Sequence, residues 1–203
     1  MKKLFVVQIS TLLLISGAFG GMMLFTDIYD DIQSNIVSLL CMSCIKLKYK
    51  TQLNFTFGTA TGQPHPNFIR DNLTKGPVFL AFRTKVCEAC DDMEPIIQEI
   101  FSVEFEKEET FYETVNFNGT DVAFIHINLD NSSEELEELF PIYDKDNVTG
   151  VPMFTIITLG YDSGFIKPYY VTAYSILSKE LLTNIILDGI NLYNKFHESY
   201  KIE

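Results

Sequence analysis

The chain has 203 residues, a formal net charge of −12 and 47% hydrophobic residues. This length allows one globular domain with its own core after a terminal segment is set aside. The acidic balance excludes a nucleic-acid partner, because phosphate binding requires a basic face that the chain lacks.

The first 26 residues predict a membrane helix or a secretory signal segment. Lys2 and Lys3 precede an uncharged run, 4–25, that ends before Asp27. The run is about 22 residues long, which is enough to span a bilayer. A signal peptide has a shorter apolar core and small residues at its cleavage site, for which 16–20 could serve. Length favours an uncleaved anchor, and with either segment the rest of the chain lies outside the cytoplasm, membrane-anchored or secreted.

Residues 27–50 form a predicted juxtamembrane segment that carries a first cysteine pair, Cys41 and Cys44, in the sequence CMSC. This pair could be a second redox pair that relays electrons from a membrane partner, a separate disulfide, or two thiols without catalytic work. Leu40 precedes Cys41, whereas a lipoprotein site needs a small residue there. The sequence leaves the three alternatives open.

Residues 51–203 form the predicted folded domain. In its first half, the partly alternating segment 51–57 predicts a strand and 67–73 predicts a short helix. The apolar run 77–82 follows a turn signal and is typical of a strand buried on both faces. Apolar residues at helical spacing over 91–107 predict an amphipathic helix directly after this strand.

The second half of the domain continues the alternation of strands and helices. We predict strands over 122–129 and 153–159, with an acidic helix over 133–140 between them that Ser132 or Ser133 caps. A hairpin partner of the second strand over 165–170 and a closing helix over 179–196 follow. This order places the domain in the α/β class, with a central mixed β-sheet flanked by helices.

A second cysteine pair, Cys87-Glu88-Ala89-Cys90, lies between the predicted strand 77–82 and the helix that follows it. The unpaired N–H groups and positive dipole end of a helix N-terminus stabilise a thiolate and lower the pKa of a thiol. The thiolate is the species that attacks a disulfide. We therefore predict Cys87, at the helix start, as the nucleophile and Cys90, one turn further, as the resolving thiol.

The segment 78–95 (VFLAFRTKVCEACDDMEP) resembles the strand, redox motif and helix of the thioredoxin family, with Pro95 where the family's helix carries a kinking proline. The loop 147–152 is similar to the loop that bears the family's cis-proline. The resemblance implies that Val151 and Pro152 bind the substrate, because a cis X-Pro bond exposes the preceding backbone to an extended segment.

The resemblance covers 70–197 and implies a thioredoxin-like fold. It also implies an extracytoplasmic thiol:disulfide oxidoreductase that acts on protein thiols and disulfides without a cofactor or metal. A client-specific binding module with the same fold, such as one for cytochrome maturation, is an alternative. A zinc site built from both cysteine pairs is another, since four thiolates can bind one zinc ion.

The chain departs from the thioredoxin pattern around the motif. Val86 stands where the family has Trp, and Glu88-Ala89 where it has Gly-Pro. The buried acid that many thioredoxins place beneath the motif falls at Ala81, and its lysine partner falls near His126. His126 either replaces that acid and its partner or is an ordinary core histidine.

These departures also bear on the redox poise. Glu88 and the two aspartates after Cys90 disfavour a thiolate at Cys87, whereas Arg83 and Lys85 oppose this effect. If the acids dominate, the reduced form is stabilised less. We therefore predict that the reduction potential of the Cys87–Cys90 pair lies nearer to that of the family's reducing members than to that of its strong oxidants.

Segments that match the glycan acceptor pattern favour an exported glycoprotein. Their asparagines are Asn54, Asn72, Asn118, Asn131 and Asn147. Asn, Ser and Thr also cluster in polar loops without modification, so occupancy stays open.

Overall fold

The computed structural model describes residues 54–200, which lie within one compact unit. The predicted segments 1–26 and 27–50, and the first residues of the predicted strand 51–57, lie outside the described residues. Among 54–200, no helix is long and apolar enough to cross a membrane.

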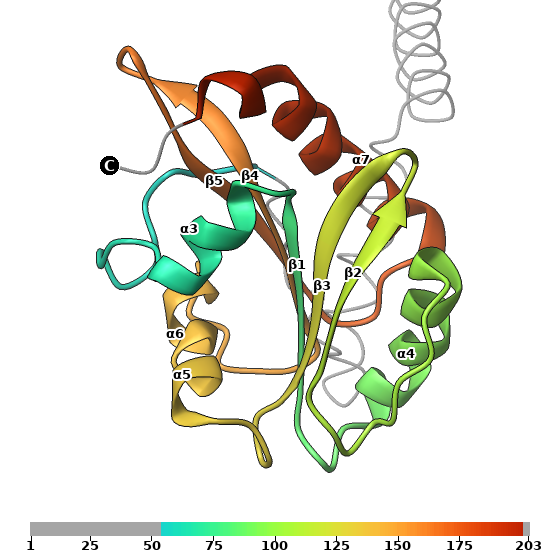
Figure 1. Ribbon diagram of the computed structural model, residues 1–203. Coiled ribbons are helices and arrows are strands. Elements are labelled where there is room, and N and C mark those ends of the chain that lie inside the picture. Colours follow the sequence, from blue (N-terminus) through green and yellow to red (C-terminus); the bar gives the residue numbers. More distant parts are fainter. Residues whose placement is uncertain (1–53, 201–203) are drawn as a thin grey trace, which may run out of the picture. The chain divides into compact units, whose positions relative to one another are not determined.

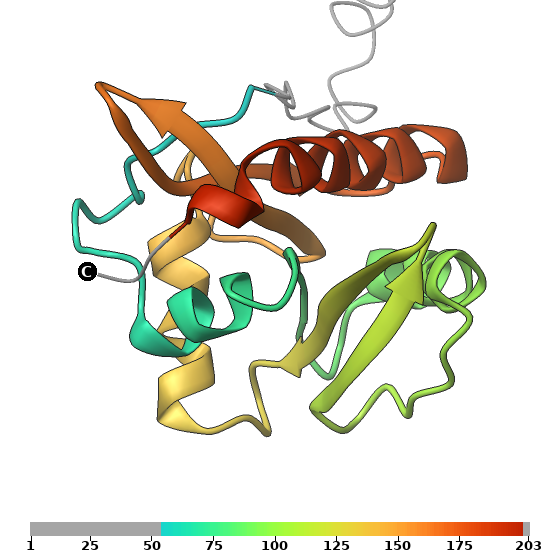
Figure 2. The ribbon, with the colours of Figure 1, turned by 45° about the horizontal axis from the view of Figure 1, so that its top comes forward.

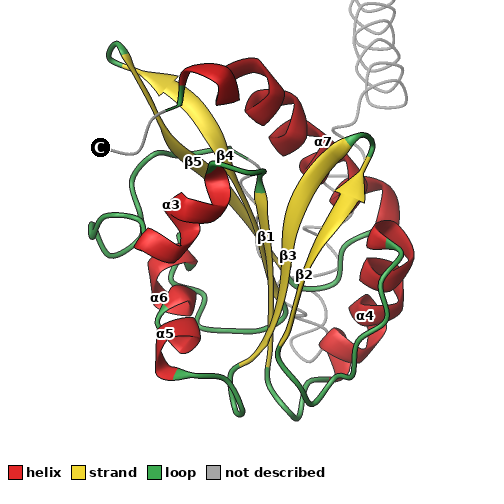
Figure 3. Cartoon of the chain, in the orientation of Figure 1, coloured by secondary structure: helices red, strands yellow, loops and turns green. Residues whose placement is uncertain are grey.

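A mixed sheet with helices on both faces makes up this unit (Figures 1 and 3). The helices of the described part are α3 (Asn67–Leu73), α4 (Glu88–Phe101), α5 (Glu134–Glu137), α6 (Leu139–Tyr143), α7 (Lys179–Phe196) and the short 3-10 helix η1 (His197–Ser199). Its strands are β1 (Val78–Arg83), β2 (Phe111–Phe117), β3 (Thr120–Asn128), β4 (Met153–Asp162) and β5 (Phe165–Tyr174).

The strands lie in the order β2-β3-β1-β4-β5 in a five-stranded sheet. β1 is parallel to β3 and antiparallel to β4, and the other neighbouring pairs are antiparallel. The predicted fold class, α/β with a central mixed sheet flanked by helices, is therefore confirmed. It is also the architecture that the resemblance to thioredoxins implies.

The central position of β1 explains its uninterrupted apolar run. Phe79 and Ala81 pack into the cluster under α4 and α7, whereas Val78, Leu80 and Phe82 pack into the cluster under α3 and α6. Figures 1 and 2 show these two pairs of helices on opposite sides of the sheet. Because both faces are covered, neither set of alternating side chains needs to be polar.

Several predicted elements are confirmed with small changes of length. The helices over 67–73 and 179–196 have the predicted bounds. The late hairpin is longer than predicted, because β4 continues to Asp162, next to a tight turn at Ser163-Gly164, and β5 begins at Phe165 as predicted but continues to Tyr174. Both turn residues have positive φ, 50° and 95°, which allows the strands to run directly into one another.

The long helix after the second cysteine pair was predicted to reach Lys107, and this was wrong. α4 ends at Phe101, and Ser102 follows in a left-handed conformation with φ 55°. Phe105 prolonged the apolar pattern, but it lies in a loop with its ring 4.3 Å from that of His126. Phe105 is therefore partly buried because its loop packs against the core, and not because its backbone is helical.

The edge strand β2 was not predicted. Only Val115 is fully buried along its seven residues, so the sequence has neither the clear alternation nor the apolar run of the other strands. Its pairing with β3 through the turn at Asn118-Gly119 defines it instead.

Two further predictions were wrong in detail. Of the strand predicted over 51–57, the described residues show an isolated bridge between Thr56 and Tyr170. The single acidic helix predicted over 133–140 is two short helices, α5 and α6, and it continues to Tyr143. Ser133 occupies the N-cap position of α5 without a side-chain capping hydrogen bond.

Gly76 allows β1 to enter the sheet beside β3. A Cβ atom at this position would overlap the backbone carbonyl oxygen of Asp121. This oxygen belongs to the sheet and cannot turn away as a flexible side chain could.

We expect Gly76→Ala to lower the free energy of unfolding by about 1–3 kcal/mol, the usual cost of overpacking. Gly58→Ala is the matched control, since a Cβ there meets nothing within 4 Å. Denaturant unfolding of both variants measures the difference. Equal stabilities would contradict the close approach.

Candidate active site

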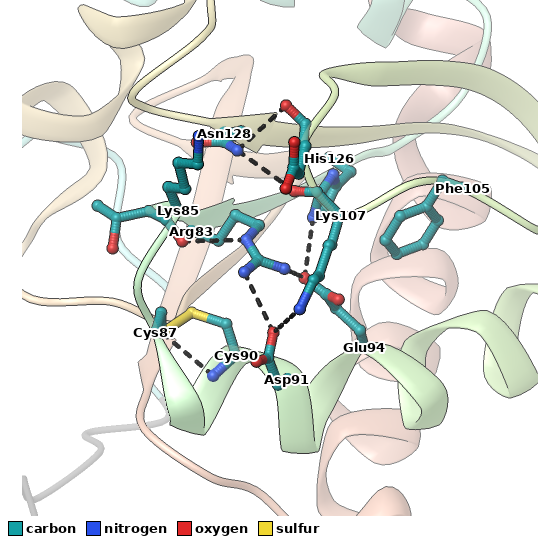
Figure 4. Close-up of polar contacts among 12 residues, drawn as sticks. Arg83, Lys85, Cys87, Cys90, Asp91, Glu94, Phe105, Lys107, His126 and Asn128 are labelled. Carbon is teal, nitrogen blue, oxygen red and sulfur yellow. Dashed lines mark hydrogen bonds and ion pairs between the residues drawn. A yellow bond between two sulfur atoms is a disulfide. The ribbon is translucent and has the colours of Figure 1, made fainter.

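Cys87 and Cys90 lie where β1 leads into α4, and they form a disulfide with a Cα–Cα distance of 5.2 Å (Figure 4). Cys87 is partly exposed, whereas Cys90 has 2% of its surface exposed. Val86, directly before the pair, is 91% exposed. A second protein can therefore reach Cys87, while Cys90 is accessible mainly through it.

The sulfur of Cys87 caps α4. Cys87 occupies the N-cap position with extended backbone, and its Sγ accepts a hydrogen bond of 3.1 Å from the backbone N–H of Cys90. After reduction, a thiolate at Cys87 would keep this N–H and the positive end of the helix dipole beside it. This geometry supports the predicted role of Cys87 as nucleophile.

The predicted substrate-binding residues, Val151 and Pro152, are joined by the cis peptide bond that the resemblance implied. Pro152 is buried and lines the same small cavity as Cys90. Its carbonyl oxygen accepts the N–H of Ser175 at 3.0 Å. Val151 precedes the first paired residue of β4, Met153, so its backbone lies beside the sheet ladder.

Asp144 holds the loop that leads to the cis-proline. Its carboxylate accepts the backbone N–H groups of Val148 and Thr149, at 2.9 and 2.8 Å, and the hydroxyl of Tyr174, at 2.9 Å. Burial raises the pKa of Tyr174, which keeps this hydroxyl a donor at neutral pH. Sequence reasoning missed Asp144, because its partners include a side chain from the distant strand β5.

A buried charged cluster lies beside the cysteines. Arg83, the last residue of β1, has a side chain that is only 2% exposed, and it pairs with two carboxylates of α4. Its Nη2 lies 3.2 Å from Asp91 Oδ1, and its Nη1 contacts Glu94 Oε1. The predicted electrostatic effect of Asp91 on the thiols is therefore offset by Arg83, and by Lys107 at 3.6 Å.

His126 and Glu94 complete this cluster (Figure 4). His126 Nδ1 lies 3.1 Å from the carbonyl oxygen of Glu109, and its Nε2 lies 3.5 Å from Glu94 Oε1. Asn128, which is fully buried, donates to the carbonyl oxygens of Lys107 and Glu108 and holds the loop after α4 against β3.

Glu94 was missed by sequence reasoning. The signal was its spacing, because a residue four positions after Cys90 lies on the same face of a helix. The position that Ala81 occupies on β1 is buried and carries no acid. α4 therefore supplies the carboxylate of the cavity that Ala81 and Cys90 line.

The remaining predicted residues are placed as follows. Glu88 is exposed as the first residue of α4. Cys41 and Cys44 lie outside the described residues, so the second pair stays a prediction. Between residues 54 and 200 no group of three or more acids, histidines or cysteines could hold a metal ion.

Comparison with known proteins gave structural matches alone: no family model and no curated protein matches the chain. A mutant thioredoxin from Halobacterium salinarum NRC-1 is 16% identical with a TM-score of 0.37, over 63% of this chain and 87% of that one. MTB DsbF in its mixed oxidized and reduced forms is 14% identical with a TM-score of 0.35, over 68% and 96%. Scores below 0.5 carry no argument, so the site rests on its own geometry.

Removing the Asp144 carboxylate should loosen the cis-proline loop. Asp144→Ala leaves the N–H groups of Val148 and Thr149, and the buried hydroxyl of Tyr174, without their acceptor. We therefore expect the free energy of unfolding to fall by about 1–3 kcal/mol. Limited proteolysis should then cut within 145–151. Asp146→Ala, at an exposed position of the same loop, is the control. Equal protection of the two variants would show that Asp144 does not hold the loop.

Proposed function

We propose that this chain is a thioredoxin-like thiol:disulfide oxidoreductase that exchanges electrons with protein substrates. One observation carries the proposal: the Cys87 sulfur caps α4 and accepts the N–H of Cys90, while Cys90 is buried behind it. Helix N-termini of this kind activate a thiolate. A purely structural disulfide would need neither a partly exposed Cys87 nor the cap.

The reaction follows from the two environments. In the reduced form, the Cys87 thiolate attacks a substrate disulfide and forms a mixed disulfide, releasing one substrate thiol. The Cys90 thiolate then attacks the Cys87 sulfur, the mixed disulfide breaks, and the second substrate thiol leaves. Two electrons pass from the cysteine pair to the substrate, and the reverse sequence oxidises a substrate dithiol.

The cis-proline loop supports a protein substrate. The backbone of Val151 lies outside the sheet ladder and directly precedes Pro152, which lines a cavity with Cys90, so an extended segment can pair with it there. The exposed side chain of Val86, directly before Cys87, offers an apolar contact. Both contacts would be made by the substrate residues next to the substrate's cysteine, so they do not depend on the rest of the substrate's fold.

We also propose that the domain lies outside the cytoplasm, held by the segment 1–26. The basic start and long apolar run of that segment support this location. A membrane redox partner that reaches Cys87 through Cys41 and Cys44 is consistent with such an anchor.

The first experiment is a redox titration of the full chain in a Cys41→Ser/Cys44→Ser background. We expect a reversible two-electron couple and catalysed reduction of insulin. Adding Cys90→Ser should trap a mixed disulfide at Cys87, because the resolving thiol is absent. Adding Cys87→Ser instead should trap none and serves as the matched control.

The titration also tests the predicted poise. We expect a potential nearer the thioredoxin value of about −270 mV than the strong-oxidant value of about −120 mV. A potential at the oxidising end would refute the effect assigned to Glu88. No reversible couple at all would leave a binding module as the function of the fold.

Export is tested by glycan occupancy. In a host that glycosylates exported proteins, Asn118→Gln should remove a glycan, because Asn118 is exposed in the β2–β3 turn. Asn72→Gln should remove none from the folded protein. The Asn72 side chain is 8% exposed, donates to the carbonyl of Phe68 and accepts from Tyr112. The readout is the mass shift after glycosidase treatment, and a chain without any glycan would contradict export by this route.

A further inference from the structure

The protonation of His126 is constrained by one backbone contact. Its Nδ1 lies 3.1 Å from the carbonyl oxygen of Glu109. A carbonyl oxygen can only accept, so Nδ1 carries a hydrogen. If the imidazole is neutral, its second nitrogen, Nε2, then has a lone pair and no hydrogen.

That second nitrogen is buried without a hydrogen-bond partner among the described residues. The His126 side chain is 2% exposed, and Glu94 Oε1 lies 3.5 Å from Nε2. A buried lone pair on Nε2 that has no donor and faces a carboxylate oxygen is unfavourable. A single proton between Nε2 and the carboxylate removes this conflict.

The charged groups around the pair come from β1, from α4 and from the loop after α4, whereas β2 places Phe111 opposite His126. β1 supplies Arg83, which contacts Glu94, and α4 supplies Asp91. The loop after α4 supplies Lys107, which lies 3.6 Å from Asp91. With a neutral imidazole these two cations and two carboxylates balance.

The pair lies beside the resolving thiol. Cys90, Glu94, His126 and Pro152 line one cavity of about 10 Å³. A cavity of roughly 10–15 Å³ is the smallest that holds a water molecule. Glu94 also follows Cys90 by one helical turn, on the same face of α4. The shared cavity therefore gives a proton a path between Cys90 and the pair through one water.

We propose that Glu94 and His126 hold the proton that Cys90 exchanges during the resolving step. This rests on the proposed function. When Cys90 resolves the mixed disulfide, its thiol proton moves to His126 Nε2, giving an imidazolium beside the Glu94 carboxylate. The Cys90 thiolate then bonds to the Cys87 sulfur, and the substrate sulfur leaves with the bonding electron pair. In the reverse direction the imidazolium returns the proton to Cys90.

The test separates the two chemical steps in the full chain with Cys41→Ser and Cys44→Ser. Reduced protein is mixed with glutathione disulfide, and the rate at which Cys90 displaces glutathione from Cys87 is followed across pH. His126→Gln should slow this displacement about 10²-fold at neutral pH, the scale of one general base. The deficit should shrink at alkaline pH, where solvent can ionise Cys90. The rate at which an alkylating reagent modifies Cys87 should be the same in His126→Gln as in the unmutated protein.

His65→Gln is the matched control, a partly buried histidine that bonds Tyr143 and the Phe57 carbonyl away from the cysteines. Glu94→Gln should slow displacement as His126→Gln does, and Glu94→Asp should restore part of the rate. An unchanged pH profile in His126→Gln would overturn the proposal while leaving the oxidoreductase intact.

A measurement on the unmutated site covers the case in which the variants do not fold. Imidazole nitrogen resonances of His126, recorded in the oxidised and reduced protein across pH, should titrate differently in the two redox states. Identical titrations would overturn the proposal. Absence of any redox couple would instead remove the proposed function, together with the inference that depends on it.

Discussion

The candidate site depends on the strand β1, which is buried on both faces and paired along both edges. It runs parallel to β3 with Ala81 opposite His126, and antiparallel to β4 with Phe82 opposite Met153. This register brings His126 from one neighbour, and Pro152 from the other, to the end of β1 where the chain turns into α4. Backbone hydrogen bonds therefore set the meeting of residues that are far apart in the sequence.

The second constraint is the charge of Arg83. A guanidinium that is almost fully buried needs carboxylate partners to offset its loss of hydration. Asp91 and Glu94 provide them from adjacent turns of α4. These ion pairs connect the end of β1 to the first turns of α4, the part of the helix that carries both cysteines. The redox pair is thus oriented by electrostatics as well as by the helix cap.

Local patterns accounted for most of the fold. The apolar run of β1 and the periodicity of α7 were sufficient because each pattern reflects its own burial. β2 was missed because an edge strand buries one residue, Val115, and leaves little pattern. The end of α4 was misplaced because Phe105 packs against the core from a loop, where it is partly buried. Periodicity does not distinguish such a residue from a helical one.

The sequence by itself determined the chemical class of the site: two cysteines at a strand-to-helix junction, and a proline whose cis geometry the resemblance implied. Only the tertiary structure decided what surrounds them. Whether His126 was satisfied or not depended on Glu109 and Glu94, which belong to a loop and a helix packed against its strand. The hydrogen-bond partners of a buried side chain are set by how distant elements pack, and no local pattern records that packing.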